Sequence, residues 1–224
     1  MFKKFYILFL FGVVFNQECP PLDTLTVNVN QNSWEIPYIN SWDELEVVTW
    51  NLKTFPQSSF TVESIVEIIN DLLPDVVNFQ EINSYSDFQD LASSLEAYDF
   101  VYSNDEYYGL AIAYRKDCIE FVDSSILFEQ YPWEFTYRYP LSANFIWSCG
   151  DSYLVFEMVN LHLKCCDNGF EQRVAASEIL SDYINEKTEN NVSLIIAGDY
   201  NDSLTDSPSN NSLFSLINNP NAFF

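Results

Sequence analysis

Apolar runs of strand length alternate along this chain with longer segments whose apolar residues recur at helical spacing. The short runs predict buried β-strands, and the longer segments predict amphipathic helices. Strands are expected at 46–50, 75–79, 100–103, 109–115, 119–127, 142–147, 153–161 and 192–197, and helices at 61–73, 84–96, 170–187 and 213–217. The chain therefore mixes strands and helices along its length, as α/β proteins do.

The predicted connections are of two kinds. The strand at 46–50, the helix at 61–73 and the strand at 75–79 form a β-α-β unit, whose right-handed crossover leaves the two strands parallel. Later in the chain, short turn segments at 116–117 and 150–151 each separate two predicted strands, which indicates two β-hairpins. The β-α-β unit should bring the ends of its strands to one edge of a sheet.

An aromatic loop at 128–140, which carries Arg138, lies between the two predicted hairpins. The strand at 153–161 leads into His162, so its antiparallel partner must begin where that strand ends. Arg138 stands just before this partner. We therefore expect Arg138 and His162 at the same edge.

Polar residues stand directly after four of the apolar runs. They are Asn51, Glu81, His162, and the pair Asp199 and Asn201 that follows Gly198. Catalytic groups in α/β proteins gather at the carboxyl ends of strands, where a dry sheet opens into loops. These residues predict one site assembled from four distant segments.

The residue types at these strand ends indicate a hard divalent cation. The chain has a single histidine and no Cys-x-x-Cys pair, so oxygen ligands suit Mg²⁺, Mn²⁺ or Ca²⁺ rather than zinc. Glu81 is the expected direct ligand, with Asn51 beside it.

The remaining polar residues suit phosphoryl chemistry. Asn201, Arg138 and His162 can donate hydrogen bonds to a phosphate group that gains negative charge in the transition state. Asp199 can accept the proton of an attacking water.

The amino terminus differs from the rest of the chain. Lys3 and Lys4 precede a short apolar run at 5–15, as in a secretory signal. We expect residues 1–18 to form a signal peptide of a secreted or periplasmic protein, with a buried first helix or strand as the alternative. Residues 19–44, rich in Pro and Asn, predict an extended lead-in, and 45–224 a single catalytic domain.

The formal net charge is −24, from 33 acidic and 9 basic residues, which excludes long-range attraction to a polyanion or an anionic membrane. A phosphate substrate must then be held by a bound cation and a few local groups. No apolar run reaches the roughly 20 residues of a transmembrane helix, so no stable membrane insertion is expected, and no obligate protein partner is indicated.

The chain has five cysteines, and export would permit disulfides among them. Cys165 and Cys166 are adjacent, and adjacent cysteines bridge each other only with strained geometry. Among the three pairings of the four later cysteines, a bond between Cys118 and Cys149 is favoured, because both lie at predicted hairpin turns away from the site.

Five short motifs together resemble a known family. They are Trp50-Asn51, Gln80-Glu81, Arg138-Tyr-Pro-Leu, Asn160-Leu-His162-Leu-Lys and Gly198-Asp199-Tyr-Asn201-Asp. In this order they resemble the motifs of the endonuclease/exonuclease/phosphatase superfamily, whose members resemble deoxyribonuclease I.

The resemblance implies an α/β (α+β) fold, a four-layer sandwich with two central mixed β-sheets, and divalent-metal-dependent hydrolysis of a phosphate ester. It assigns Glu81 to the metal and Asn51 to its support. It places His162 beside the scissile phosphate and Arg138 on a phosphate oxygen, and it makes Asp199 and Asn201 the pair that orients water.

The family's closing Asp-His element has no counterpart in this sequence. We therefore expect the last strands to be missing and hydrolysis by this chain to be weak or absent. The favoured function is a secreted nuclease acting on DNA. The alternatives are a phospholipid or phosphoinositide phosphodiesterase or phosphatase of the same fold, and a non-catalytic binding module.

Overall fold

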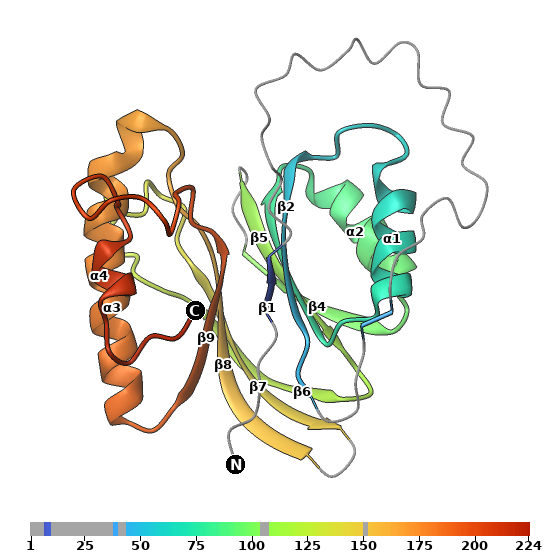
Figure 1. The fold of residues 1–224 in the computed structure, drawn as a ribbon. Coiled ribbons are helices and arrows are strands. Elements are labelled where there is room, and N and C mark those ends of the chain that lie inside the picture. Colours follow the sequence, from blue (N-terminus) through green and yellow to red (C-terminus); the bar gives the residue numbers. More distant parts are fainter. Residues whose placement is uncertain (1–6, 10–37, 40–43, 104–107, 150–151) are drawn as a thin grey trace.

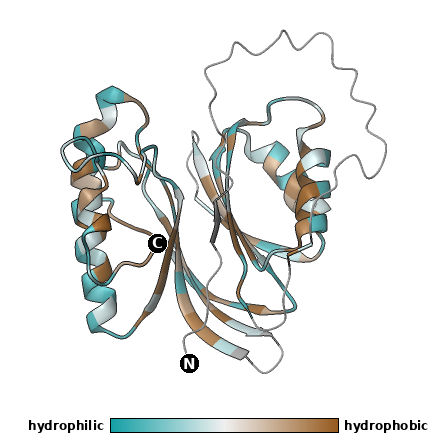
Figure 2. Cartoon of the chain, viewed as in Figure 1, coloured by the Kyte–Doolittle hydropathy of each residue, from teal (hydrophilic) through white to brown (hydrophobic). Residues whose placement is uncertain are grey.

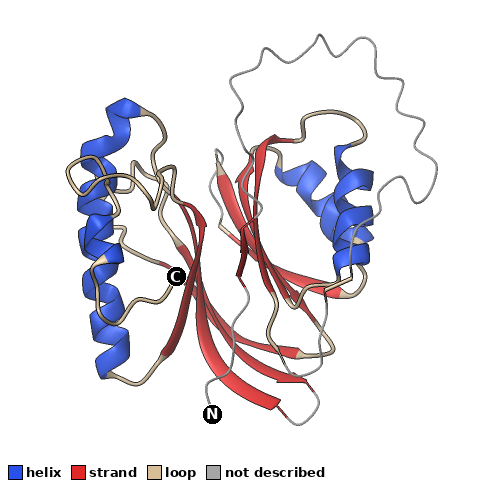
Figure 3. Ribbon diagram, viewed as in Figure 1, coloured by secondary structure: helices blue, strands red, loops and turns tan. Residues whose placement is uncertain are grey.

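The fold is known from a computed structural model, which describes residues 7–9, 38–39, 44–103, 108–149 and 152–224. Two mixed β-sheets pack face to face, and helices cover the outer side of each (Figures 1 and 3). This arrangement confirms the predicted four-layer α/β sandwich with two central mixed sheets.

The first sheet has the strand order β1-β2-β3-β5-β4 and the second β6-β7-β8-β9. The strands are β1 (Ile7–Phe9), β2 (Val47–Phe55), β3 (Val76–Ile82), β4 (Tyr98–Tyr102), β5 (Gly109–Arg115), β6 (Ile119–Ile126), β7 (Leu141–Cys149), β8 (Ser152–His162) and β9 (Ser193–Asp199). In the first sheet β2 and β3 are parallel, and in the second β8 and β9 are parallel.

The helices divide between the two outer layers. They are α1 (Thr61–Leu72), α2 (Tyr85–Ser94), α3 (Phe170–Glu189) and α4 (Phe214–Ile217), with a 3-10 turn η2 at Asp167–Gly169. Figure 1 shows α1 and α2 against the first sheet and α3 and α4 against the second. Helix α1 ends at its C-cap residue Leu73, which takes a left-handed conformation. Pro74 follows directly and cannot continue the helix. The predicted β-α-β unit with parallel strands is confirmed.

One predicted hairpin is wrong and the other is correct. The turn at 116–117 does not join partners, because β5 lies in the first sheet and β6 in the second. Both edges of β5 are already paired, one with β3 and the other with β4, so no edge remains for β6. The chain instead crosses between the sheets there, and β6 pairs with β7. The hairpin of β7 and β8 is confirmed by their antiparallel register.

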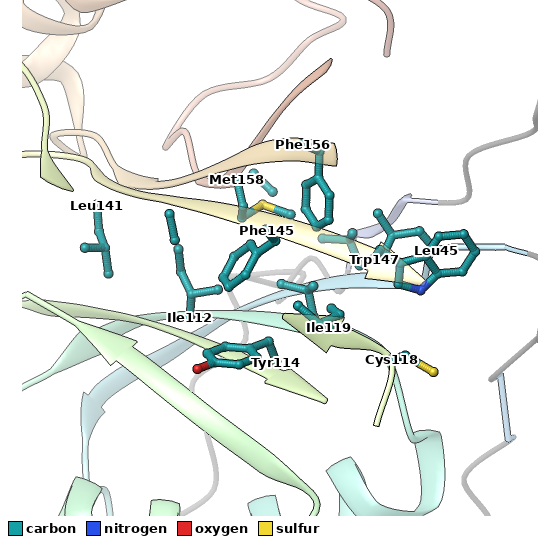
Figure 4. Packing of buried hydrophobic residues seen from close by; sticks show 14 of the residues in the cluster. Leu45, Ile112, Tyr114, Cys118, Ile119, Leu141, Phe145, Trp147, Phe156 and Met158 are labelled. Carbon is teal, nitrogen blue, oxygen red and sulfur yellow. The ribbon is translucent and has the colours of Figure 1, made fainter. Parts of the chain in front are cut away.

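Three apolar clusters hold the four layers together. One fills the space between the sheets and includes Tyr114, Phe145, Trp147 and Phe156 (Figure 4). A second lies between the first sheet and its helices, and a third between the second sheet and α3 and α4. Figure 2 shows brown, hydrophobic stretches on the strands of both sheets and on α1.

Only part of the predicted signal peptide is described. Residues 7–9 of the segment 1–18 form β1, which pairs in parallel with β2. The other residues of this segment, and most of the lead-in 19–44, lie outside the described residues. The signal peptide stays a prediction. None of the described helices is both long and apolar enough to cross a membrane.

Cys118 is disulfide-bonded, whereas Cys165 and Cys166 are free thiols. The side chain of Cys149 lies outside the described residues, so its predicted bond to Cys118 stays a prediction. The backbones are close, since the N–H of Ser148 donates to the carbonyl of Cys118 over 2.8 Å.

Candidate active site

Four strand ends, two from each sheet, meet at one edge of the sandwich. Parallel pairing brings the ends of β2 and β3 together in the first sheet. In the second sheet the register of β8 and β9 sets His162 directly opposite Asp199. The structure therefore brings the four segments together, although Asn51 lies inside β2 and Glu81 inside β3 and not after the strand ends as predicted.

Asn51 joins two carboxylates that come from different sheets. Its Nδ2 donates to Oε1 of Glu81 over 3.0 Å and to Oδ2 of Asp199 over 2.7 Å. Its Oδ1 accepts a hydrogen bond of 2.8 Å from the N–H of Lys53, which sets the orientation of the amide. Asn51 thus presents a donor to the carboxylates and holds them together.

Glu81 is held in place by an unusual backbone conformation. Its own φ is 62°, and those of Lys53 and Thr54 are 49° and 57°. This geometry lets the N–H of Thr54 donate to Oε2 of Glu81 over 2.8 Å. Positive φ at non-glycine residues costs free energy and clusters at functional sites, which agrees with a demanding position for this carboxylate.

His162 lies inside the cluster and is only 2% exposed. Its Nε2 is 3.7 Å from Oε1 of Glu81 and 3.8 Å from Oδ2 of Asp199. Burial first, and then the charge of Arg138, lower the pKa of His162 against the opposing effect of the two carboxylates. The imidazole is therefore neutral at neutral pH.

Arg138 lies beside His162 as the sequence predicts. Its Nη1 is 3.1 Å from Nε2 of His162, and because a guanidinium only donates, this ring nitrogen accepts. The guanidinium carbon also lies 4.1 Å from the ring centre of Tyr108, whose ring is 5.9 Å from that of His162. Tyr108 is a site residue that sequence reasoning missed, since no pattern marks it.

Asn201 takes up a tight turn after β9, with a φ of 52°. Its N–H donates to Oδ1 of Asp199 over 2.9 Å, and its Nδ2 donates to the carbonyl of Leu163 over 2.9 Å. The structure thus brings Asn201 next to Asp199, with its amide group bound to the chain just past His162.

Gly198 is required by the close approach of β9 to β8. A Cβ at this position would lie 2.1 Å from the carbonyl oxygen of Leu161, and its φ of 154° is unfavourable for residues with side chains. The glycine before Asp199 therefore has a packing role that places the carboxylate of Asp199.

A buried polar network lies beneath the site and connects the two sheets. Nε2 of Gln80 donates to Oδ1 of Asn160 over 2.7 Å. Nδ2 of Asn160 donates to the carbonyls of Phe79 and Ala111, each over 2.9 Å. Gln80 and Asn160 stand in two of the five sequence motifs, but the sequence analysis predicts no role for them. Their position as polar residues inside apolar runs is the signal that indicates a buried network. The network fixes β8 against the first sheet two residues before His162.

The cluster has the donor set that a hard divalent cation needs. Ligand atoms of Glu81, His162 and Asp199 all lie within 4.8 Å of one another. Two carboxylates suit Mg²⁺ or Mn²⁺, and the nearby imidazole does not change that preference. Asn51 contributes by orienting both carboxylates, since its oxygen is bonded to Lys53.

The family model of the endonuclease/exonuclease/phosphatase family matches residues 48–219, a range that contains every residue of this cluster. The chain belongs to this family. Its fold is that of phosphodiester hydrolases, and the predicted resemblance is confirmed. Comparison with curated proteins finds no significant match.

Solved structures of this family have the same fold. The D. rerio TDP2 complexed with single strand DNA product is 25% identical, with a TM-score of 0.62 over 72% of this chain and 62% of that chain. The human Nocturnin catalytic domain with bound sulfate anion is 19% identical, with a TM-score of 0.56 over 77% and 71%. A family protein from Bacteroides thetaiotaomicron is 20% identical, with a TM-score of 0.61 over 77% and 68%.

This chain spans less than two thirds of the first D. rerio TDP2 chains that it matches, 66% and 62% of their lengths.

Proposed function

We propose that this protein is a divalent-metal-dependent phosphodiesterase that acts on nucleic acid, with single-stranded DNA as the favoured substrate. The observation that supports this most is the meeting of two carboxylates, a neutral histidine and an arginine at one point: Glu81, Asp199, His162 and Arg138.

Each residue has a chemical role in this proposal. Glu81 would hold Mg²⁺, and the ion would supply positive charge to the phosphate oxygens. Arg138 donates to a non-bridging phosphate oxygen, which its guanidinium can reach by leaving His162. Asp199 accepts the proton of the attacking water, while Asn201 keeps that carboxylate in position through its N–H.

His162 donates once it carries a proton on Nε2. In the described arrangement Nε2 accepts from Arg138, so a phosphate that binds Arg138 frees Nε2 to take up a proton between the two carboxylates. The protonation of His162 and the binding of phosphate are therefore coupled through Arg138.

An aromatic pocket beside the site supports a nucleic-acid substrate. It begins at Ile82 and Asn83, next to Glu81, and Tyr85 and Tyr102 line it with ring centres 4.9 Å apart. These tyrosines are 47% and 38% exposed. Because the net charge of −24 opposes long-range attraction to a phosphate backbone, base stacking, worth about 1–3 kcal/mol per base, suits this surface better. One structural neighbour, D. rerio TDP2, is itself known in complex with a single-stranded DNA product.

A lipid phosphodiester is the second candidate, favoured by the loop that carries Arg138. In this loop Trp133 is 53% exposed and Tyr137 is 73% exposed, as a membrane contact requires. Phe135 of the same loop is fully buried in the third apolar cluster and makes no such contact.

One assay separates the two candidates. The purified chain is incubated with single-stranded DNA and with sphingomyelin liposomes, each with Mg²⁺ and with chelator, beside His162→Ala and a control, Glu96→Gln, on the surface. DNA hydrolysis that needs Mg²⁺ and His162 supports the nuclease. Hydrolysis of the lipid alone would replace it by the second candidate. Measurable hydrolysis at equal rates by wild type and His162→Ala would contradict either enzyme, and no hydrolysis of either substrate would favour the non-catalytic binding module.

We also propose that the protein is secreted through residues 1–18. The charged and apolar amino terminus supports this, as does the disulfide of Cys118, since disulfides persist in oxidising compartments. Amino-terminal sequencing of protein recovered from the medium should find a first residue that lies after the signal segment. Retention of Met1 on a protein that stays in the cells would contradict secretion.

A further inference from the structure

Two free thiols lie side by side close to the active site. Cys165 and Cys166 belong to the loop 163–166 between β8 and η2, which begins directly after His162. The Sγ of Cys166 donates to the Sγ of Cys165, with 2.7 Å between the sulfurs. Cys166 is exposed and Cys165 is half-buried, so small molecules can reach the pair.

The backbone holds the pair in this conformation from both sides. Cys166 has a φ of 71°, which is uncommon for a residue with a side chain. Nη1 of Arg173 donates to the carbonyl of Lys164 over 2.8 Å and to that of Cys166 over 3.0 Å. The N–H of Gly169 also donates to the Cys166 carbonyl, over 2.9 Å. The two sulfurs therefore meet because the loop is clamped, and not because free side chains happen to rotate together.

Arg173 connects this loop to the other side of the active site. The arginine is 5% exposed, and its Nε donates to Oγ of Ser212 over 3.0 Å and lies 3.4 Å from Oδ2 of Asp202. Asp202 directly follows Asn201, whose amide binds the carbonyl of Leu163. One buried guanidinium thus fixes the dithiol loop and the turn after Asp199 together.

We propose that Cys165 and Cys166 form a reversible vicinal disulfide by exchange with a small-molecule disulfide such as oxidised glutathione. The thiolate of one cysteine attacks the small disulfide, forms a mixed disulfide and releases one glutathione thiolate. The thiolate of the other cysteine then attacks its neighbour's sulfur and releases the second glutathione. Two protein thiols are oxidised to one disulfide, one glutathione disulfide is reduced to two thiols, and the two protons pass to the released thiolates.

The second step is favoured by position. The attacking sulfur is already in contact with its target, so the reaction within the chain proceeds at a high effective concentration and outruns a second adduct. The small ring between adjacent residues is strained, and strained disulfides are the more easily reduced ones. The pair should therefore open and close with the redox state of its surroundings, unlike the disulfide of Cys118.

The sequence allows a direct test. Lys164 and Arg173 bracket both thiols, so trypsin releases them together in the peptide 165–173, which contains no other cysteine. The purified full chain is equilibrated with graded ratios of oxidised to reduced glutathione, and free thiols are then blocked with iodoacetamide. The protein is digested with trypsin, and the mass of the peptide 165–173 is measured by mass spectrometry. The expected result is an unblocked peptide two hydrogens lighter than the dithiol, whose share falls again when reduced glutathione is added.

Cys166→Ser supplies the second measurement, because it removes one partner and keeps the size of the side chain. It should collect a stable glutathione adduct on Cys165, which the wild type should not. Peptide 165–173 carrying two blocking groups at every ratio, stable glutathione adducts in the wild type, or a bond from this peptide to another cysteine would each overturn the proposal. A melting temperature of Cys166→Ser equal to that of the reduced wild type ensures that the comparison concerns the folded protein.

Discussion

The side-chain amide of Asn51 on β2 donates a hydrogen bond of 2.7 Å to the carboxylate of Asp199 on β9, 148 residues later in the chain. The two strands belong to different sheets. The same amide group also donates to Glu81, so a single neutral side chain keeps two carboxylates close without a positive charge between them.

Replacing Asn51 by alanine should weaken metal binding about 10- to 100-fold, because residues that orient metal ligands contribute on that scale. Titration calorimetry with Mg²⁺ would measure the change. Asn190→Ala, at the exposed end of α3, is the control and should bind Mg²⁺ like the wild type. An unaltered affinity in Asn51→Ala would show that the carboxylates need no bridge.

Glu81→Gln should remove the stabilisation that Mg²⁺ gives to the folded protein. A ligand present at about 100 times its Kd adds about 2.7 kcal/mol to stability, which thermal unfolding resolves easily. The amide keeps the shape of the side chain but lacks its charge. Glu96→Gln, on the exposed surface after α2, should keep the full shift in melting temperature. If Glu81→Gln kept it as well, the metal would bind elsewhere.

Gly198→Ala should destabilise the protein by more than about 1 kcal/mol, since alanine is strained at this backbone conformation and its Cβ would overlap the backbone of Leu161. The displaced strand end would also carry Asp199 away from His162. Urea unfolding measures the first effect and hydrolysis the second. Ser193→Ala, at the exposed start of β9, should change neither, and wild-type stability in Gly198→Ala would contradict the close packing of β8 and β9.

Asp202→Asn should lower stability at neutral pH by about 1.5–3 kcal/mol, the usual contribution of hydrogen bonds to a charged group. Burial raises the pKa of Asp202, but hydrogen bonds from Ser212 and Ser203 and the charge of Arg173 outweigh it and hold the pKa below its ordinary value.

The sign of the pH effect follows from that lowered pKa. The contribution of the ionised carboxylate is fully present above the unfolded pKa of about 3.9 and is lost as the pH falls through the lower folded-state pKa. The difference between wild type and Asp202→Asn in urea unfolding should therefore shrink below about pH 4. A difference that stayed constant well below about pH 4 would remove the ionic explanation, and Asp182→Asn on the exposed side of α3 serves as the control.

Local sequence patterns were sufficient to predict most strands and helices and the edge of the sheets at which the polar site residues lie. Alternation and helical spacing depend on neighbours within a few positions, so the β-α-β unit, the helix α3 and the hairpin of β7 and β8 follow from the residues themselves. The same holds for Glu81 and His162, because both lie at the carboxyl ends of buried strands, where the sheet opens into loops.

Pairing between distant segments was decided by the tertiary structure alone. The strands β5 and β6 follow each other closely in the chain but belong to different sheets, because both edges of β5 are already paired, one with β3 and the other with β4. The contact of Tyr108 with Arg138 and the bond from Asn51 to Asp199 likewise depend on how two sheets pack. Such contacts join residues tens of positions apart, and the free energy that selects them comes from the shared core, which no local stretch of sequence contains.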